Sequence, residues 1–221
     1  MLPFLEQDNV YRLYNVNVDW NHPSNYDAIR TYMPVFNCPA TAPGERIDDT
    51  IAAQPACGDY STVSALKTYV AINCFGIPHL VDPEDPRILG ALVKDEKSRI
   101  RDITDGASNT IMVAECAGRP SLYIVGGVLG NPNIAGWKQG GWADAGAPFS
   151  IDGSNEDGSV PGGCAINCSN NSEVYSFHSG GANVSFADGS VRFLVQSMNL
   201  CVLAKLVTRA GGLPEEVFPD E

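Results

Sequence analysis

Two stretches of the chain carry enough side-chain oxygens to suggest a cation site. The first runs from Asp152 to Gly158 and offers Asp152, Asn155 and Asp157. Carboxylate and amide oxygens are the ligands that Ca²⁺ prefers. The spacing does not match an EF-hand loop, because aligning Gly158 with the invariant glycine leaves another glycine at the first ligand position. Calcium bound in a different geometry is therefore one hypothesis for this segment.

The second stretch surrounds the sequence Asp-Gly-Ala-Ser-Asn-Thr that begins at Asp105. Asp102, Asp105, Asn109 and Glu115 are its candidate cation ligands. The composition favours the alternative, a turn whose Asp and Ser oxygens accept hydrogen bonds from its own backbone amides. Ser108 could act as a nucleophile only with a positioned base, and the sequence shows none.

His178 and Asp188 could be taken for a catalytic pair, but the strand between them keeps them apart. About six strand residues at roughly 3.3 Å each separate the two side chains by about 20 Å. Asp188 is therefore predicted to be a turn residue that tolerates positive φ, together with Gly189. His178 is predicted to be a structural histidine that binds a loop carbonyl. We accordingly predict no catalytic residues and no enzymatic activity.

The segment around Asp188-Gly189 predicts a β-hairpin with a two-residue type I′ turn, because β-forming residues lie on both sides of it. Counting outward pairs Phe186 with Val191 and Val184 with Phe193. These four side chains would then share one apolar face of the hairpin.

Motifs through most of the chain resemble a large bacterial family of prepilin-like proteins of unknown function, whose C-terminal signature is His, nine residues and Asp-Gly. The matching segments are Leu2-Pro3-Phe4-Leu5-Glu6-Gln7 with Tyr11 and Tyr14, Phe36-Asn37-Cys38-Pro39, Ile103 to Ile111 ahead of Glu115, Phe177 to Leu194, and Thr208-Arg209-Ala210-Gly211-Gly212.

The resemblance implies an α+β, pseudopilin-like fold, in which an N-terminal helix packs on an antiparallel sheet that ends in the hairpin. It also implies a non-catalytic pilin- or pseudopilin-like subunit, outside the cell or in its envelope, that assembles with copies of itself or with related subunits. Family members usually begin with a prepilin leader and a long apolar helix. This chain begins where that helix would end, so we expect either a shortened chain or a leaderless form.

The formal charge of −12 argues against partners that require clustered Lys and Arg, namely nucleic acid and anionic lipid. Divalent cations could bridge such an acidic surface. No apolar run approaches the roughly 18 to 20 residues of a membrane span. The 22 Gly and 15 Pro residues predict a loop-rich β or α+β protein.

The region from 130 to 176 is predicted to be a loop-rich insertion within a single domain of residues 1–221. A loop of that length is usually functional, or is ordered by a disulfide, a metal or a neighbouring subunit. Trp137, Trp142 and Asp144 could contact a sugar ring or another subunit. The main rival hypothesis is therefore an extracellular carbohydrate-binding module. A hydrolase is the third, and would need two carboxylates, or Ser and His, in one cleft.

Seven cysteines are many for a chain of this size, and the odd number leaves one unpaired. Cys164 and Cys168 lie close in a loop, so we predict a local disulfide between them. Cys74, Cys116 and Cys201 lie in apolar stretches and are predicted to be buried free thiols.

Hydrophobic periodicity and turn residues predict the remaining elements. The expected helices cover 2–15, a short stretch that Ser24 caps and Pro34 ends, and a final helix that Asn199 caps and Gly211-Gly212 ends. The expected strands cover 35–38, 67–75, 110–114 and 123–129, with an exposed loop at 39–56.

Overall fold

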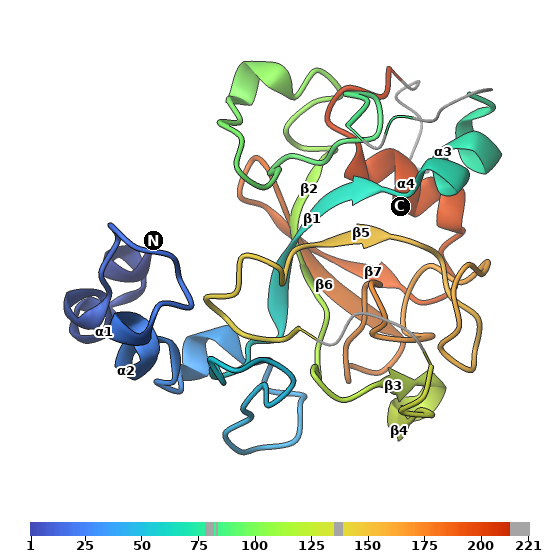
Figure 1. Cartoon of the computed structure of the whole chain (residues 1–221). Coiled ribbons are helices and arrows are strands. Elements are labelled where there is room, and N and C mark those ends of the chain that lie inside the picture. The colour runs from blue at the N-terminus through green and yellow to red at the C-terminus, as the bar shows by residue number, and fades with distance from the viewer. Residues whose placement is uncertain (78–81, 83, 135–138, 213–221) are drawn as a thin grey trace.

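A five-stranded, mostly antiparallel sheet forms the centre of the molecule, in a computed structural model that describes residues 1–77, 82, 84–134 and 139–212 (Figure 1). The strand order is β5-β1-β2-β6-β7, and only the β1–β5 pair is parallel. The five strands are β1 Tyr60–Leu66, β2 Ile111–Glu115, β5 Phe149–Ile151, β6 Gly181–Phe186 and β7 Val191–Val195. A separate hairpin joins β3 Tyr123–Ile124 to β4 Val128–Leu129. The predicted α+β class is confirmed.

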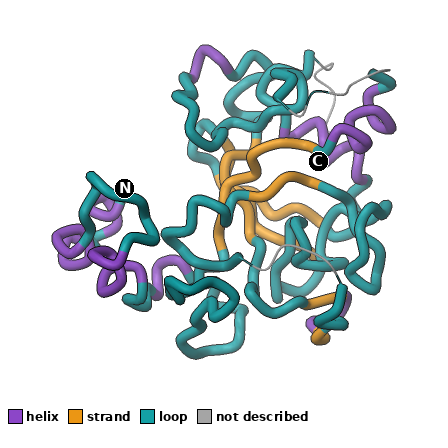
Figure 2. The backbone as a smooth tube through the Cα atoms, viewed as in Figure 1, coloured by secondary structure: helices purple, strands orange, loops and turns teal. Residues whose placement is uncertain are grey.

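Helices lie in two places. α3 Thr68–Phe75 and α4 Leu200–Val207 pack together, and α4 also contacts β1 and β2. α1 Asp8–Leu13 and α2 Tyr26–Ile29 pack against each other to one side of the sheet (Figure 1). The described part of the chain also contains five short 3-10 helices: Leu2–Leu5, Pro23–Asn25, Pro34–Phe36, Ile100–Asp102 and Val125–Gly127. Long loops surround the sheet elsewhere (Figure 2).

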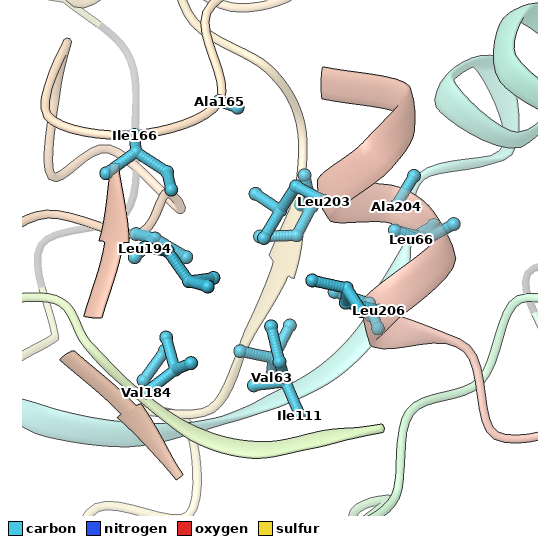
Figure 3. Close-up of a cluster of buried hydrophobic side chains, with 14 of the residues drawn as sticks. Val63, Leu66, Ile111, Ala165, Ile166, Val184, Leu194, Leu203, Ala204 and Leu206 are labelled. Carbon is cyan, nitrogen blue, oxygen red and sulfur yellow. The ribbon is translucent and has the colours of Figure 1, made fainter. Parts of the chain in front are cut away.

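The main core lies between α4 and the sheet. Leu203 and Leu206 of α4 are buried against Val63 of β1 and Ile111 of β2 (Figure 3). Loop residues Ala165 and Ile166 complete this core. Fully burying each large aliphatic side chain contributes about 1.5–3 kcal/mol. The prediction that Asn199 caps the last helix is confirmed, because its Oδ1 accepts a hydrogen bond from Cys201 N at 2.8 Å.

A smaller core forms an N-terminal lobe, which we define as residues 1–37. Val10, Ala28 and Met33 are buried together at its centre. Partly buried Leu2 and Tyr14 pack against them. The predicted helix over 2–15 is interrupted, because Glu6 adopts a left-handed conformation between a 3-10 turn and α1. The prediction that Ser24 caps the second helix was wrong, because Ser24 lies inside the Pro23–Asn25 turn. His22 caps that turn by accepting the Ser24 amide at its Nδ1, and α2 follows after Asn25.

The C-terminal hairpin is present, but its predicted register was wrong by one residue. Val191 pairs with Ser185 rather than Phe186, and Phe193 pairs with Asn183 rather than Val184. The loop has three residues, closed by a Phe186 N to Ser190 O hydrogen bond of 2.9 Å. In such loops a type I turn is followed by a left-handed residue that forms a bulge, and Gly189 takes that place with φ of 87°.

A one-residue shift moves every side chain of a strand to the other face. Val184 and Phe186 are buried as predicted, but Val191 and Phe193 are exposed. The side chain of Arg192 instead lies on the Phe186 side, with its guanidinium 4.3 Å from the ring centroid. The four apolar side chains therefore do not share one face.

Three predicted strands are also corrected. Residues 67–75 form helix α3, in which Val70 and Ala71 are buried and a left-handed Gly76 ends the helix. Of the predicted strand 35–38, Val35 and Phe36 belong to the 3-10 turn Pro34–Phe36, and Asn37 ends that turn. The predicted strand over 123–129 is split into β3 and β4, because Gly126 and Gly127 both have positive φ. The buried strand predicted at 110–114 is confirmed as β2.

The disulfide predicted between Cys164 and Cys168 is confirmed. Cys74 and Cys201 were predicted to be free, but they form a second disulfide that joins α3 to α4. Cys38, Cys57 and Cys116 are free and buried. Among the described residues, no helix is long and apolar enough to cross a membrane.

We expect the two disulfides to contribute unequally to stability. Cys74–Cys201 closes a sequence separation of 127 residues and Cys164–Cys168 one of 4. Loop-closure entropy gives about 5 and about 2 kcal/mol respectively. Replacing Cys74 and Cys201 by Ala should therefore lower the free energy of unfolding by roughly 2–3 kcal/mol more than replacing Cys164 and Cys168. Chemical denaturation without reductant measures both, and equal losses would contradict this expectation.

Candidate functional site

Three side chains from distant parts of the chain meet at one end of β2. Cys38 follows the Pro34–Phe36 turn, Glu115 is the last residue of β2, and His178 precedes β6. His178 Nε2 lies 3.3 Å from Cys38 Sγ and 3.4 Å from Glu115 Oε1. The three candidate donor atoms all lie within 4.8 Å of one another. We call Cys38, Glu115 and His178 the Cys-Glu-His cluster.

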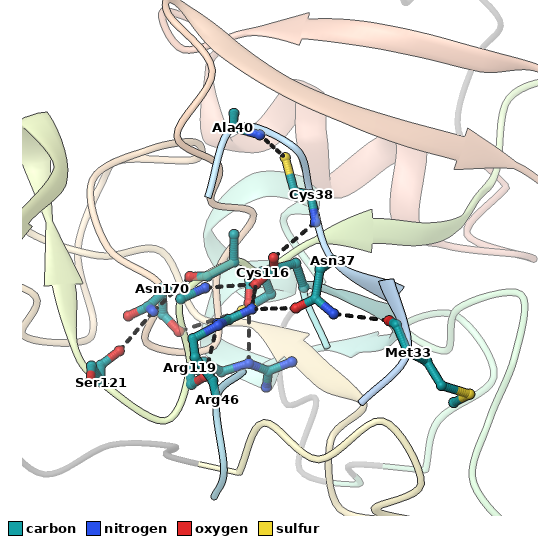
Figure 4. Close-up of polar contacts among 12 residues, drawn as sticks. Met33, Asn37, Cys38, Ala40, Arg46, Cys116, Arg119, Ser121 and Asn170 are labelled. Atoms are coloured by element: carbon teal, nitrogen blue, oxygen red, sulfur yellow. Dashed lines mark hydrogen bonds and ion pairs between the residues drawn. The ribbon is translucent and has the colours of Figure 1, made fainter. Parts of the chain in front are cut away.

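The buried carboxylate of Asp59 positions Cys38. Asp59 Oδ2 accepts the Cys38 amide at 2.9 Å, and Oδ1 accepts the Gly118 amide at 2.9 Å. Arg46 Nη2 donates to Asp59 Oδ1 at 2.5 Å and to Asn37 Oδ1 at 2.9 Å (Figure 4). Cys38 is thus held from its backbone, and its side chain is left for the cluster.

Glu115 is fully buried and satisfied on one oxygen only. Its Oε2 accepts the Asn183 amide of β6 at 2.6 Å. Its Oε1 has no hydrogen-bond partner, although His178 Nε2 lies at ion-pair distance. The His178 amide donates to Ser176 Oγ at 3.1 Å. His178 was predicted to bind a loop carbonyl; instead its ring faces a thiol and a carboxylate.

The cluster does not have the geometry of a nucleophile–base–acid triad. In such a triad one imidazole nitrogen faces the nucleophile and the other faces the carboxylate. Here one nitrogen, Nε2, faces both Cys38 and Glu115. Burial raises the pKa of the Cys38 thiol. The hydrogen bond from the Ala40 amide lowers this pKa in part, and the neighbouring Glu115 raises it further. A protonated thiol is a poor nucleophile, whereas a thiolate, an imidazole and a carboxylate are all ligand types for zinc.

Two other motif segments, 103–111 and 208–212, meet at Asp105. Its carboxylate accepts hydrogen bonds from Thr208 Oγ1 at 3.1 Å, Gly211 N at 2.7 Å and Gly212 N at 3.0 Å. Asp102 Oδ2 accepts the Arg99 amide at 2.9 Å. The carboxylate of Asp105 thus fastens the segment after α4 to the start of β2. Cation binding by Asp102 and Asp105 stays a prediction.

The three oxygen-bearing residues of the acidic loop lie in different surroundings. Asp152 is buried, and its Oδ1 accepts the Tyr69 hydroxyl at 2.6 Å. Asn155 and Asp157 are exposed. Asn155 Nδ2 donates to Ser159 Oγ at 3.0 Å, and Asp157 Oδ1 accepts the Ser159 amide at 2.9 Å. Calcium binding in this loop also stays a prediction.

Asp188 and Gly189 lie at the far end of β6 from the cluster. Asp188 Oδ1 accepts the Ser190 amide at 2.8 Å, and its own amide donates to Ala107 O at 3.1 Å. Asp188 was predicted to occupy this turn because it tolerates positive φ. Of the two residues, only Gly189 has a positive φ. His178 therefore contacts the last residue of β2, and Asp188 contacts Ala107 in the turn before β2.

An apolar groove of about 570 Å³ lies between the N-terminal lobe and β1. Trp142 and Asp144 line it, and Trp142 stacks on Phe36 with ring centroids 5.8 Å apart. Trp142 Nε1 and Asp144 Oδ2 are buried without a hydrogen-bond partner. Burial raises the pKa of Asp144, and the hydrogen bond from the Gly146 amide lowers it in part. Trp137 lies outside the described residues.

Residues 1–200 match the model of a family described as "Protein of unknown function (DUF1559)", with the short name SBP_bac_10. The chain belongs to this family. No curated protein and no solved structure matches it.

Within this DUF1559 chain, sequence reasoning did not connect Cys38 and Glu115 with His178. A usable signal was present, because Cys38 and His178 lie within motif segments that carry the resemblance, and Glu115 lies four residues after another one. The groove gave no such signal, because its walls come from segments that only the fold brings together.

A buried carboxyl next to Asp152 predicts a pH effect. Burial and the Asp152 charge raise the pKa of Glu173 well above its ordinary value, although the Asp152 amide donates to Glu173 Oε1 at 2.8 Å. The folded state then binds a proton that the unfolded state releases, so stability falls as pH rises from about 4.5 through the folded-state pKa.

Replacing Glu173 by Gln should therefore raise the melting temperature relative to the parent protein, and the gain should grow between pH 5 and pH 8. Glu156→Gln, at an exposed position, is the matched control. Melting curves across this pH range measure both variants. A Glu173→Gln difference that shrinks with rising pH would contradict the assignment.

Proposed function

We propose that the chain is a non-catalytic extracellular or envelope-associated subunit, pilin- or pseudopilin-like, that assembles through its N-terminal lobe. The observation that carries this proposal is the exposure of the lobe's apolar side chains. Met1, Phe4 and Val16 are 83%, 90% and 66% exposed, and Leu13 is more than half exposed. Exposed apolar residues concentrated in one region mark interaction sites more often than single scattered ones do.

The position of the lobe supports the same proposal. α1 and α2 lie beside the sheet rather than on it (Figure 1), so a neighbouring subunit can approach them. The lobe has its own small core, which stabilises its fold. The exposed apolar residues are not part of that core. Assembly through this surface buries apolar area, the main favourable contribution in protein association.

Two further observations support a non-catalytic, extracellular subunit. The motif residues around Asp59 and Asp105 bond to other parts of the same chain. They hold the fold together, and their oxygens do not face the groove. The two disulfides suit an oxidising compartment.

Phe4→Asp should weaken assembly without weakening the fold. Phe4 is 90% exposed, so its loss costs little intramolecular packing, while a carboxylate in an apolar interface is costly. Ile100→Asp is the matched control, because Ile100 is also strongly exposed, at 78%, but lies outside the lobe. Light scattering after size exclusion, over a concentration series, measures the mass of both variants and of the parent.

We expect the parent and Ile100→Asp to associate to the same extent and Phe4→Asp to associate at least tenfold more weakly. A parent chain that stays monomeric at millimolar concentration would contradict assembly through the lobe. Association weakened to the same extent by Phe4→Asp and by Ile100→Asp would also contradict assembly through the lobe.

The groove favours a second candidate function, a ligand-binding module. Trp142 and Asp144 both line the groove, and each carries a buried polar atom without a hydrogen-bond partner, the indole N–H and Oδ2. The aromatic rings of Tyr11 and Tyr60 line the same space. A ligand with an apolar face and a hydroxyl, such as a sugar ring, would suit these walls.

Trp142→Phe tests this candidate, because it keeps an aromatic ring and removes the N–H donor. If the groove binds a glycan, an array of soluble oligosaccharides should identify a ligand of the parent chain that binds Trp142→Phe at least about tenfold more weakly. Equal binding by the parent and the variant would place the ligand elsewhere.

A further inference from the structure

The Cys-Glu-His cluster is a buried group of three donors of different chemistry, drawn from three separate segments of the chain. Cys38 and Glu115 are buried, and the His178 side chain is 31% exposed. The cluster therefore has a closed side and a side from which solvent can enter. We infer that Cys38, Glu115 and His178 bind a divalent transition-metal ion, and that Zn²⁺ fits the site best.

The distances agree with tetrahedral ligands around one ion. With Zn–S of about 2.3 Å and Zn–N and Zn–O of about 2.0–2.1 Å, tetrahedral angles put sulfur and nitrogen about 3.5 Å apart and nitrogen and oxygen about 3.4 Å apart. The observed separations are 3.3 Å for Cys38 Sγ to His178 Nε2 and 3.4 Å for His178 Nε2 to Glu115 Oε1. Two of the three separations between donor atoms therefore match a tetrahedral ion, and the third is within 4.8 Å.

Hydrogen bonding also favours an ion at this position. His178 Nε2 carries at most one proton, so it cannot satisfy Cys38 and Glu115 at once. Glu115 Oε1 is the atom left without a hydrogen-bond partner. If Nε2 is unprotonated, its lone pair, the thiolate and Oε1 all converge on the same space. A cation is the group that would satisfy all three.

Charge supports the same conclusion. Glu115 is fully buried, and its Oε2 bonds only to the amide and the side chain of Asn183. The carboxylate of Asp59, also buried, is paired with Arg46. A buried carboxylate requires a nearby positive charge. The metal would supply it and would at the same time stabilise Cys38 as a thiolate.

The parts around the cluster are suited to hold its ligands in place. Asp59 fixes the Cys38 backbone, and the Asn183 amide fixes the second Glu115 oxygen. Tyr60 faces Glu115 in the β1–β2 ladder. Such supporting contacts orient metal ligands in known sites. With three protein ligands, the fourth position would hold water.

The competing explanation is an ion pair without metal. A protonated His178 would then donate to Glu115 or Cys38, and the chain would have no specific affinity for zinc. The inference is independent of the proposed assembly, because the site uses none of the exposed residues of the N-terminal lobe. The metal-binding test can therefore fail while the assembly proposal stands, and the assembly test can fail while the metal-binding inference stands.

The experiment uses the full chain, purified without oxidant so that Cys38 stays reduced, stripped with EDTA and titrated with Co²⁺ and then Zn²⁺. Bound Co²⁺ should show a thiolate-to-metal charge-transfer band and tetrahedral ligand-field bands at one ion per chain. Zn²⁺ should displace it, because zinc favours such a tetrahedral site. The parent protein alone therefore gives a spectroscopic readout before any substitution is made.

His178→Ala and Cys38→Ala identify the ligands, with His22→Ala and Cys57→Ala as matched controls. His22 is exposed, and Cys57 is a second buried free thiol outside the cluster. Each cluster variant should bind at least about 100-fold more weakly, given that losing even a supporting residue costs 10–100-fold. The charge-transfer band should disappear in Cys38→Ala. Both controls should bind like the parent.

Circular dichroism shows whether a variant has kept its fold. His178 is partly exposed, so His178→Ala is the variant expected to fold normally even if Cys38→Ala does not. A parent chain that binds no stoichiometric Co²⁺ would overturn the inference in favour of the ion pair. Binding without a thiolate band, or binding unchanged in a folded His178→Ala, would overturn it as well.

Discussion

The buried carboxylate of Asp59 is the interaction on which the arrangement of the molecule depends. It lies directly before β1 and accepts hydrogen bonds from the backbone of Cys38, from the backbone of Gly118 and from Arg46. Arg46 also donates to Asn37 Oδ1 and to Arg119 O. One carboxylate therefore fixes the end of the N-terminal lobe, the start of β1 and the segment after β2. Because it is fully buried, losing any partner would leave charge or polar groups unsatisfied.

The spacing between His178 and Asp188 follows from this arrangement. β6 runs antiparallel to β2, so a segment that begins near Glu115 ends near the start of β2. His178 contacts Glu115 at one end, and Asp188 contacts Ala107 at the other. The nine residues between His178 and Asp188 therefore match the length of β6 and its turn. His178 and Asp188 both contact other parts of the fold.

Local signals in the sequence predicted the elements whose chemistry is local. The hairpin, β2, the Asn199 cap and the Cys164–Cys168 disulfide each depend on neighbouring residues, and each is present. The register of the hairpin was missed because Asp-Gly suits both a two-residue turn and a three-residue turn with a bulge. α3 was predicted as a strand because its residues favour strands, and packing against α4 overrides that preference.

The candidate sites depend on contacts that no local pattern encodes. Cys38, Glu115 and His178 converge only because of the sheet order and the Asp59 contacts. The Cys74–Cys201 pair likewise depends on α3 being a helix beside α4. The acidic loop, in contrast, was suggested by composition alone. The structure shows a buried Asp152 and two exposed residues there, so composition did not predict their surroundings.

We infer that Cys38, Glu115 and His178, brought together from three separate segments, form a zinc-binding cluster. The X-ray absorption spectrum of the 1:1 zinc complex tests it most directly, because the spectrum reports the identity and distance of the ligand atoms. The account predicts one sulfur at about 2.3 Å with two or three nitrogen or oxygen atoms at about 2.0–2.1 Å. A shell of oxygen and nitrogen alone, or one with several sulfur atoms, would contradict it.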